Sequence, residues 1–184
     1  APWATPFELP PFAEIVPEHF LPAFEHALAS HRAEIDRIAE NPADPTFADT
    51  IAALEDAGRL LNRVSAVFWN LAGAHTNDAL QAIEREISPK LAQHRNAITS
   101  NAALFARIDA VFKSDQTARL GAEEKRVLER THLNFVRAGA RLDAEGKERM
   151  SRIVERLAAL GTRFSQNVLA DEKNYVLPLG KEDL

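Results

Sequence analysis

Residues 46–71 read TFADTIAALEDAGRLLNRVSAVFWNL, and their apolar side chains recur at the spacing of an α-helix. The members of this stripe are Phe47, Ile51, Leu54, Leu61, Val64, Phe68 and Leu71. Thr46 followed by Asp49 has the spacing of a capping box, which predicts that the helix begins here. Gly58 occupies a position of the stripe where an apolar side chain would be expected. Because glycine costs about 1 kcal/mol of helix propensity, we expect a neighbouring helix to approach closely at this point.

Similar apolar stripes lie on both sides of this stretch. They predict further helices over residues 20–40, 77–98, 101–112, 122–141 and from 144 onward. Thr76 or Asn77 caps the helix that follows, and Pro89 either kinks that helix or restarts it with Ser88 as the cap. Asp143 caps the last helix. Its stripe comprises Met150, Ile153, Leu157, Leu160, Phe164 and Val168.

The lengths of these helices predict an elongated bundle. Three of them have about 20 residues or more and would be about 30 Å long, whereas a compact domain of this size has a radius of gyration of about 16 Å. We therefore expect an all-α fold of about six mostly antiparallel helices over residues 18–173. Residues 174–184, with the strand-like stretch 175–179, would be a truncated connection to a missing part.

Residues 1–17 contain five of the ten prolines, which excludes a helix or a central strand there. Trp3, Phe7, Leu9, Phe12 and Ile15 are interleaved with these prolines. So much apolar area is not typical of a disordered leader. We expect an extended arm that packs on the body of the domain.

Composition excludes several classes of protein. The 184 residues carry a net charge of −5, so nothing favours nucleic acid as a partner. The chain has no cysteine, which excludes disulfides and thiolate zinc sites. It also lacks an apolar run of about twenty residues, so no membrane partner is expected. The absence of a signal pattern favours the cytoplasm, or the periplasm if a signal has been removed. The first residue is not methionine, and we expect a processed or truncated chain.

The six histidines give no complete site. They are His19, His26, His31, His75, His94 and His132. No two are spaced i, i+4 around a glutamate as in zinc peptidases, and we expect solvated or capping side chains. His94 lies on an apolar stripe. We expect it to be half-buried and bonded to a carbonyl, with a ligand or a pH switch as the alternative.

Other candidate motifs are also incomplete. Glu129 and His132 form half of a di-iron motif, but the second half is absent. No nucleophile elbow or phosphate loop is present. Four arginines lie near one face of the last helix: Arg149, Arg152, Arg156 and Arg163. Glu145 and Glu148 are placed to pair with two of them, which favours a solvated face over an anion site or a site for a peptide C-terminus. We assign no catalytic, metal or cofactor residue, and the substrate-binding residues stay unassigned. The pattern alone indicates a binding or structural module.

A series of short blocks points further. They are TPFELPPF (5–12), IVPEHFLPAF (15–24), NP (41–42), PTFADTI (45–51), LE (54–55), FWNL (68–71), TN (76–77), PKL (89–91), FVRAGA (135–140) and FSQN (164–167). In this order they resemble the N-terminal helical region of the thimet-oligopeptidase-like zinc metallopeptidases. The bacterial peptidyl-dipeptidases are most similar, with the oligopeptidase A group as relatives.

This resemblance implies a parent chain several times longer, with one zinc ion in a downstream His-Glu-x-x-His helix and no catalytic or metal residue in the present segment. It implies that these helices form part of the wall of a narrow channel that admits short peptides, and that the parent releases dipeptides from a free C-terminus. The downstream catalytic domain would be the partner. Apolar area left open, with Trp3, Trp69 and Tyr175 as candidates, would favour self-association. A stand-alone interaction module and a metal-binding bundle are the alternative hypotheses.

Overall fold

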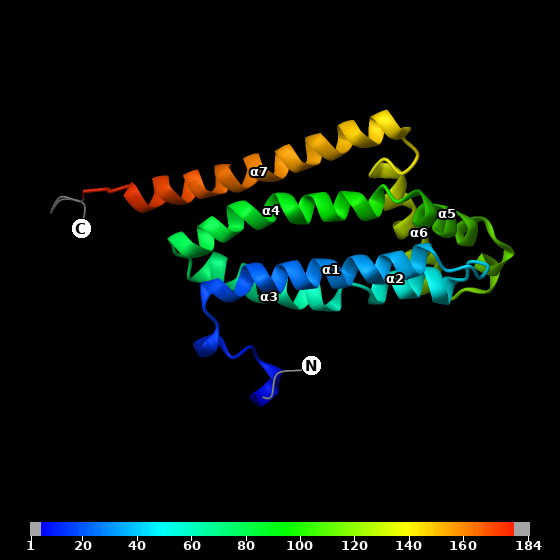
Figure 1. Ribbon diagram of the computed structural model, residues 1–184, viewed down its shortest axis with the longest axis horizontal. Coiled ribbons are helices and arrows are strands. Elements are labelled where there is room, and N and C mark those ends of the chain that lie inside the picture. Colours follow the sequence, from blue (N-terminus) through cyan, green and yellow to red (C-terminus); the bar gives the residue numbers. More distant parts are fainter. Residues whose placement is uncertain (1–4, 179–184) are drawn as a thin grey trace.

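The computed structural model describes residues 5–178, and over these residues the chain forms helices and turns without a strand (Figure 1). Within this part, six helices have twelve or more residues. They are α1 (Phe20–Ala39), α3 (Arg59–Ala74), α4 (Asp78–Thr99), α5 (Ala102–Lys113), α6 (Ala122–Arg137) and α7 (Ala144–Asn174). The all-α prediction is confirmed. Trp3 and residues 179–184 lie outside the described residues, and residues 175–178 form no regular element.

The long helices lie side by side and give the molecule its elongated shape (Figure 1). α3 runs back along α1, and α7 runs back along α4, so each of these pairs is antiparallel. α5 and α6 pack together at the end of the bundle where α1 and α4 finish. The predicted bundle of about six mostly antiparallel helices is therefore present.

Several predicted helix starts are confirmed by their caps. The Thr46 hydroxyl accepts the Asp49 N–H at 3.2 Å, and the Asp49 carboxylate accepts the Thr46 N–H at 3.0 Å. Asn77 caps α4, and Asp143 caps α7. Pro89 lies inside α4, which continues on both sides of it, so this helix does not restart at Ser88.

The continuous helix predicted for residues 46–71 is wrong. This stretch forms a π-helical segment (Phe47–Ala52) and the short α2 (Ala53–Asp56), and it then breaks before α3. Gly58 at the break has φ +78°, in the left-handed region that favours glycine. Its N–H donates to Glu34 Oε2 of α1 at 2.7 Å. The expected close approach is real, because a Cβ on Gly58 would lie 2.9 Å from the ring of His31.

Two clusters of buried residues form the core. In the first, α1 and α3 meet around Phe68, whose ring packs edge-on against Phe20 at 5.1 Å and Phe24 at 5.4 Å between centroids. The second cluster joins the C-terminal half of α1 and the π-helical segment to α5 and α6, around Ile51, Leu104 and Ile108. Burial of each such side chain contributes about 1.5–3 kcal/mol. Two separate clusters explain why the domain is long rather than round.

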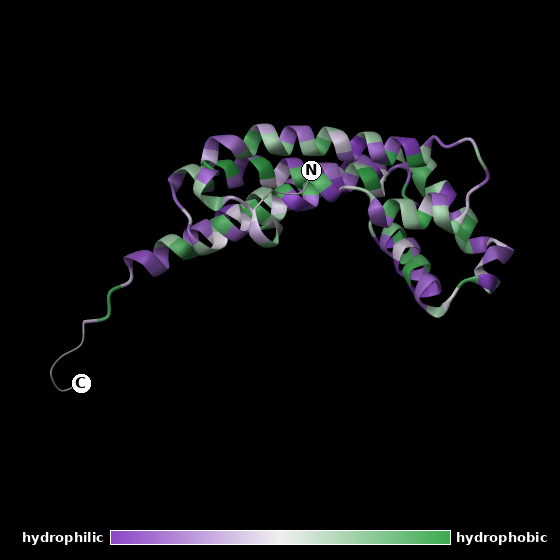
Figure 2. Cartoon of the chain, turned by 90° about the horizontal axis from the view of Figure 1, so that it is seen from below, coloured by the Kyte–Doolittle hydropathy of each residue, from purple (hydrophilic) through white to green (hydrophobic). Residues whose placement is uncertain are grey.

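The arm and α7 lie outside these clusters. The arm forms three single 3-10 turns (Pro6–Glu8, Phe12–Glu14 and Pro17–His19). Its Ile15 packs on the first cluster, whereas the side chain of Phe7 is 93% exposed. α7 packs along α4, and none of its residues is buried. Apolar and polar residues are interspersed along this helix (Figure 2). Among the described residues, no helix is long and apolar enough to cross a bilayer.

Candidate functional site

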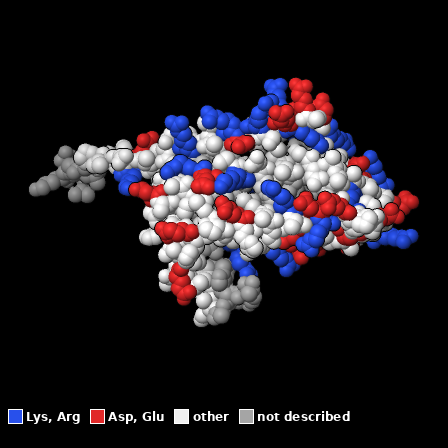
Figure 3. Space-filling view, viewed as in Figure 1, with Lys and Arg blue, Asp and Glu red and all other residues white. Residues whose placement is uncertain are grey.

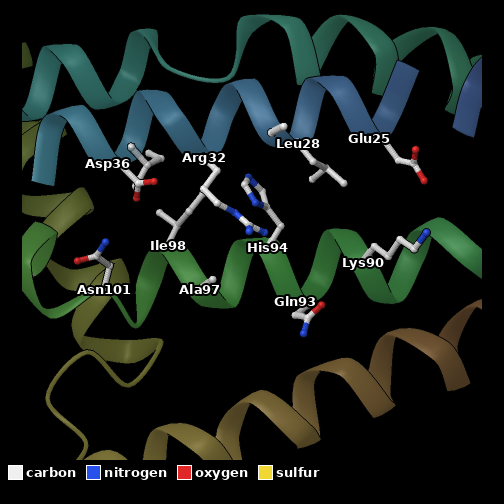
Figure 4. Close-up of a pocket in the computed structure, with 12 residues that line it drawn as sticks. Glu25, Leu28, Arg32, Asp36, Lys90, Gln93, His94, Ala97, Ile98 and Asn101 are labelled. Atoms are coloured by element: carbon white, nitrogen blue, oxygen red, sulfur yellow. The ribbon is translucent and has the colours of Figure 1, made fainter. Parts of the chain in front are cut away.

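A groove of about 860 Å³ runs between α1 and α4 (Figure 4). Glu25 and Lys90 lie at one end of it, Asp36 and Asn101 lie at the other, and Arg32 lies with His94 between them. The walls between the two ends include the apolar side chains of Leu28 and Ile98 as well as the polar Gln93. Charges of both signs therefore border the groove, which suits the binding of a polar segment better than bond-breaking chemistry.

Lys90 is already paired in this groove. Its Nζ lies 2.7 Å from Glu86 Oε1, one turn earlier on α4. The hydrogen bond to Glu86 raises the pKa of Lys90, and the charge of Glu25 adds to this effect. Lys90 therefore stays protonated at neutral pH and is not a general base.

His94 lines the groove, and its ring contacts His31 of α1. His94 Nε2 lies 3.1 Å from His31 Nδ1, so one imidazole donates and the other accepts. Burial lowers the pKa of His94 to about 4, and the nearby His31 and Arg32 add to this effect. Burial also lowers the pKa of His31, against the attraction of Glu34. The pair is thus neutral at pH 7 and joins α1 to α4.

This geometry corrects the prediction for His94. The side chain is buried rather than half-buried, and its partner is the ring of His31 rather than a carbonyl. The pairing was missed because the two residues are 63 positions apart. Two signals could have indicated it: the place of His94 on an apolar stripe, and the vacancy at Gly58 that the ring of His31 fills.

We predict that the His31–His94 pair makes stability depend on pH. The folded pKa of His94 lies below its usual value of 6.5, so the unfolded state binds more protons between pH 6.5 and pH 4. The free energy of unfolding should therefore fall by about 2 kcal/mol as the pH falls through this window. Urea titrations at pH 7, 5.5 and 4 measure it.

The matched variants are His94→Gln and His26→Gln, because His26 lies on the exposed side of α1. The His94 variant should flatten the pH dependence, whereas the His26 variant should leave it unchanged. An unchanged slope in His94→Gln would contradict the assignment.

His132 is the second buried histidine, which is also contrary to the expected solvated side chain. Its ring stacks on Phe112 with centroids 4.0 Å apart, and its Nε2 lies 3.0 Å from Asp109 Oδ1. Lys113 lowers the pKa of Asp109 by its hydrogen bond, and His132 adds to this effect against the cost of burial. Glu129 instead pairs with Arg126, so Glu129 and His132 do not form a joint site.

The remaining histidines and the arginine face agree better with the sequence analysis. His19 and His75 are cap residues of α1 and α3, and His26 is exposed. On α7, Arg152 pairs with Glu148 at 3.4 Å, as the spacing predicts. Among residues 5–178, no three His, Asp or Glu side chains gather where they could hold a metal ion.

A polar cluster centres on the buried Arg107 of α5, which no sequence motif indicated. Its guanidinium donates to the carbonyl oxygens of Asn41 at 2.6 Å and Ala43 at 2.8 Å, and to Asp49 Oδ1 at 3.0 Å. Burial would raise the pKa of Asp49, but the hydrogen bonds from Thr46, Thr50 and Arg107 outweigh it and lower the pKa. This cluster fixes the loop between α1 and the π-helical segment and is structural.

Comparison with known proteins adds what the geometry leaves open. No protein-family profile matches the chain. The chain is 41% identical over 169 residues to a dipeptidyl carboxypeptidase of Escherichia coli, which is 92% of this chain and 25% of that protein. It is 40% identical to the corresponding enzyme of Salmonella typhimurium and 28% identical to oligopeptidase A of E. coli, again over about a quarter of each. The chain thus spans about a quarter of the length of these relatives.

Proposed function

The chain belongs to the thimet-oligopeptidase family, and from this premise we propose that it is a non-catalytic helical region of a longer peptidase, where it forms part of the wall of the substrate channel. One observation carries the proposal. Nearly the whole chain matches a dipeptidyl carboxypeptidase, yet it accounts for only 25% of that protein. The substrates would be short peptides, from which the longer protein releases dipeptides at the free C-terminus.

The fold suits such a wall. Long helices that lie side by side give a stiff surface, and the groove between α1 and α4 offers polar groups of both signs to an extended peptide. The resemblance implies zinc, but the described residues of this segment include no set of ligands for it. We therefore assign metal binding and hydrolysis to the rest of the longer protein.

A peptidase assay tests this proposal. The longer protein should release dipeptides from a short peptide with a free C-terminus, and at least about tenfold more slowly from its amidated form, because a site that binds a carboxylate rejects an uncharged analogue. Residues 1–184 alone should cleave neither peptide and retain no stoichiometric zinc after dialysis. Cleavage by this segment alone would contradict the proposal.

The exposed apolar surface of α7 favours one alternative, a stand-alone helical interaction module. The length of the encoding reading frame separates the two. A reading frame that continues into a His-Glu-x-x-His motif supports the peptidase. One that stops at residue 184 supports the module.

A further inference from the structure

α7 presents two unlike faces. The face on α4 is formed by half-buried residues that are mostly small or polar: Ser151, Val154, Ala158, Thr162 and Gln166. Polar contacts fix α7 against α4 near both ends of this face. Lys147 Nζ donates to the Ser100 carbonyl at 3.1 Å, and Gln166 accepts from Arg85 at 2.7 Å and donates to the Gln81 carbonyl at 3.1 Å.

The apolar stripe of α7 does not face α4. Its exposed fractions are 45% for Ile153, 62% for Leu157, 43% for Leu160, 70% for Phe164 and 40% for Val168. We call these five residues the α7 apolar face. A stripe with steps of three and four residues is typical of a helix that packs on another element. Soluble monomers rarely leave a contiguous apolar patch of more than a few hundred Å² open, so this face is expected to be covered in the assembled protein.

A row of arginines borders this face on the side away from α4. Its members are Arg149, Arg152, Arg156 and Arg163. Arg152 and Arg156 precede Ile153 and Leu157 by one residue, whereas the residues that touch α4 follow them by one. Since each residue turns the helix by about 100°, the row and α4 lie on opposite sides of the apolar stripe. Figure 3 shows Lys and Arg side chains along the edge of the molecule where α7 runs. Within the described part of the chain, only Arg152 of this row has an ion-pair partner.

We propose that the α7 apolar face is the docking surface for the rest of the same longer protein, which covers it with an apolar surface edged by acidic side chains. This inference rests on the proposed function. The matched stretch is about a quarter of each relative, so the relatives contain about three times as much further chain, which supplies the material to cover the face. The positive charge of this row is complementary to a negatively charged border on the partner.

A second copy of this segment fits the face less well. In an antiparallel pair of α7 helices, the arginine rows of the two copies lie on the same side of the seam and repel each other. This conflict disappears when the partner has a different surface.

Thiol labelling tests the docking surface directly, because this segment has no cysteine. Leu157→Cys and Phe164→Cys place a thiol on the face, and Glu155→Cys places a control thiol on the opposite side of α7. In the longer protein, the two thiols on the face should react at least about tenfold more slowly than in residues 1–184 alone, whereas the control should react within about twofold. Equal rates at all three positions would overturn the proposal.

A charge on the face gives a second measurement. Leu157→Asp should leave the urea midpoint of residues 1–184 unchanged, because the side chain is exposed there, and should lower the midpoint of the longer protein, where it is buried. An unchanged midpoint in the longer protein would overturn the proposal. So would thiol protection that rises with the concentration of the short chain and is absent in the longer protein, because that result assigns the face to a second copy.

These results separate the two proposals. Slow labelling in a longer protein that does not hydrolyse peptides would retain the docking surface and remove the proposed function. Fast labelling in an active peptidase would do the reverse.

Discussion

Replacing Arg107 with methionine should lower the free energy of unfolding by about 3–5 kcal/mol, because it removes one partner of a buried ion pair. The arginine side chain is 8% exposed, and it is paired with Asp49, which is 29% exposed. Methionine fills much of the volume but donates no hydrogen bond. The carbonyl oxygens of Asn41 and Ala43 and the carboxylate of Asp49 would all lose the hydrogen bonds that the guanidinium donates.

The matched control is Arg59→Met. Arg59 also pairs with an aspartate, Asp56, but both side chains are more than half exposed. An exposed pair contributes about 0–1 kcal/mol, so this variant should unfold at nearly the wild-type urea concentration. Chemical denaturation of residues 1–184 measures both variants. Equal midpoints for the two would show that the Arg107 cluster does not hold the domain together.

The Arg107 cluster also explains what the sequence resemblance detects. Asn41 belongs to one of the blocks that carry the resemblance, and Thr46 and Asp49 belong to another. In the structure, these residues hold a loop and cap a helix start. Gln166, from the last block, fastens α7 to α4. Some of the residues in the blocks that carry the resemblance therefore fix backbone geometry.

Helix positions and caps could be predicted because they depend on local spacing. The apolar stripes and the caps Thr46, Asn77 and Asp143 are all local signals. The structure confirms the three caps, and it confirms the helices except for the continuous one over residues 46–71, which breaks at Gly58. Contacts between distant residues could not be predicted in this way. The pairing of His31 with His94 and the role of Arg107 depend on how α1, α4 and α5 are packed, which no local pattern encodes.

The α7 apolar face shows a further limit of prediction from the sequence. Its spacing correctly predicted a helix, but the same spacing is expected whether the stripe faces the domain or an outside partner. The exposed area was expected at Trp69 and Tyr175, which are 39% and 71% exposed. Both are exposed as expected, but the longest exposed stripe among the described residues lies on α7, because α4 meets the small and polar side of that helix. Only the packing of α7 on α4 reveals this.

The break at Gly58 combines a local and a distant constraint, which makes it a sensitive position. Gly58→Val should lower the free energy of unfolding by about 2–4 kcal/mol, because a β-branched residue at φ +78° is strained and its Cβ would meet the ring of His31. A shift of that ring would also disturb the contact with His94. Urea denaturation at pH 7 measures the loss.

Gly73→Ala, near the end of α3, is the matched control. Gly73 has a negative φ, and no atom lies within 4 Å of the position that a Cβ would take. Alanine there should leave the free energy of unfolding unchanged or raise it by up to about 1 kcal/mol. If Gly58→Val were as stable as Gly73→Ala, the left-handed break would not be required. Residues 46–71 could then form the continuous helix that their apolar spacing predicts, with His31 turned away from α3.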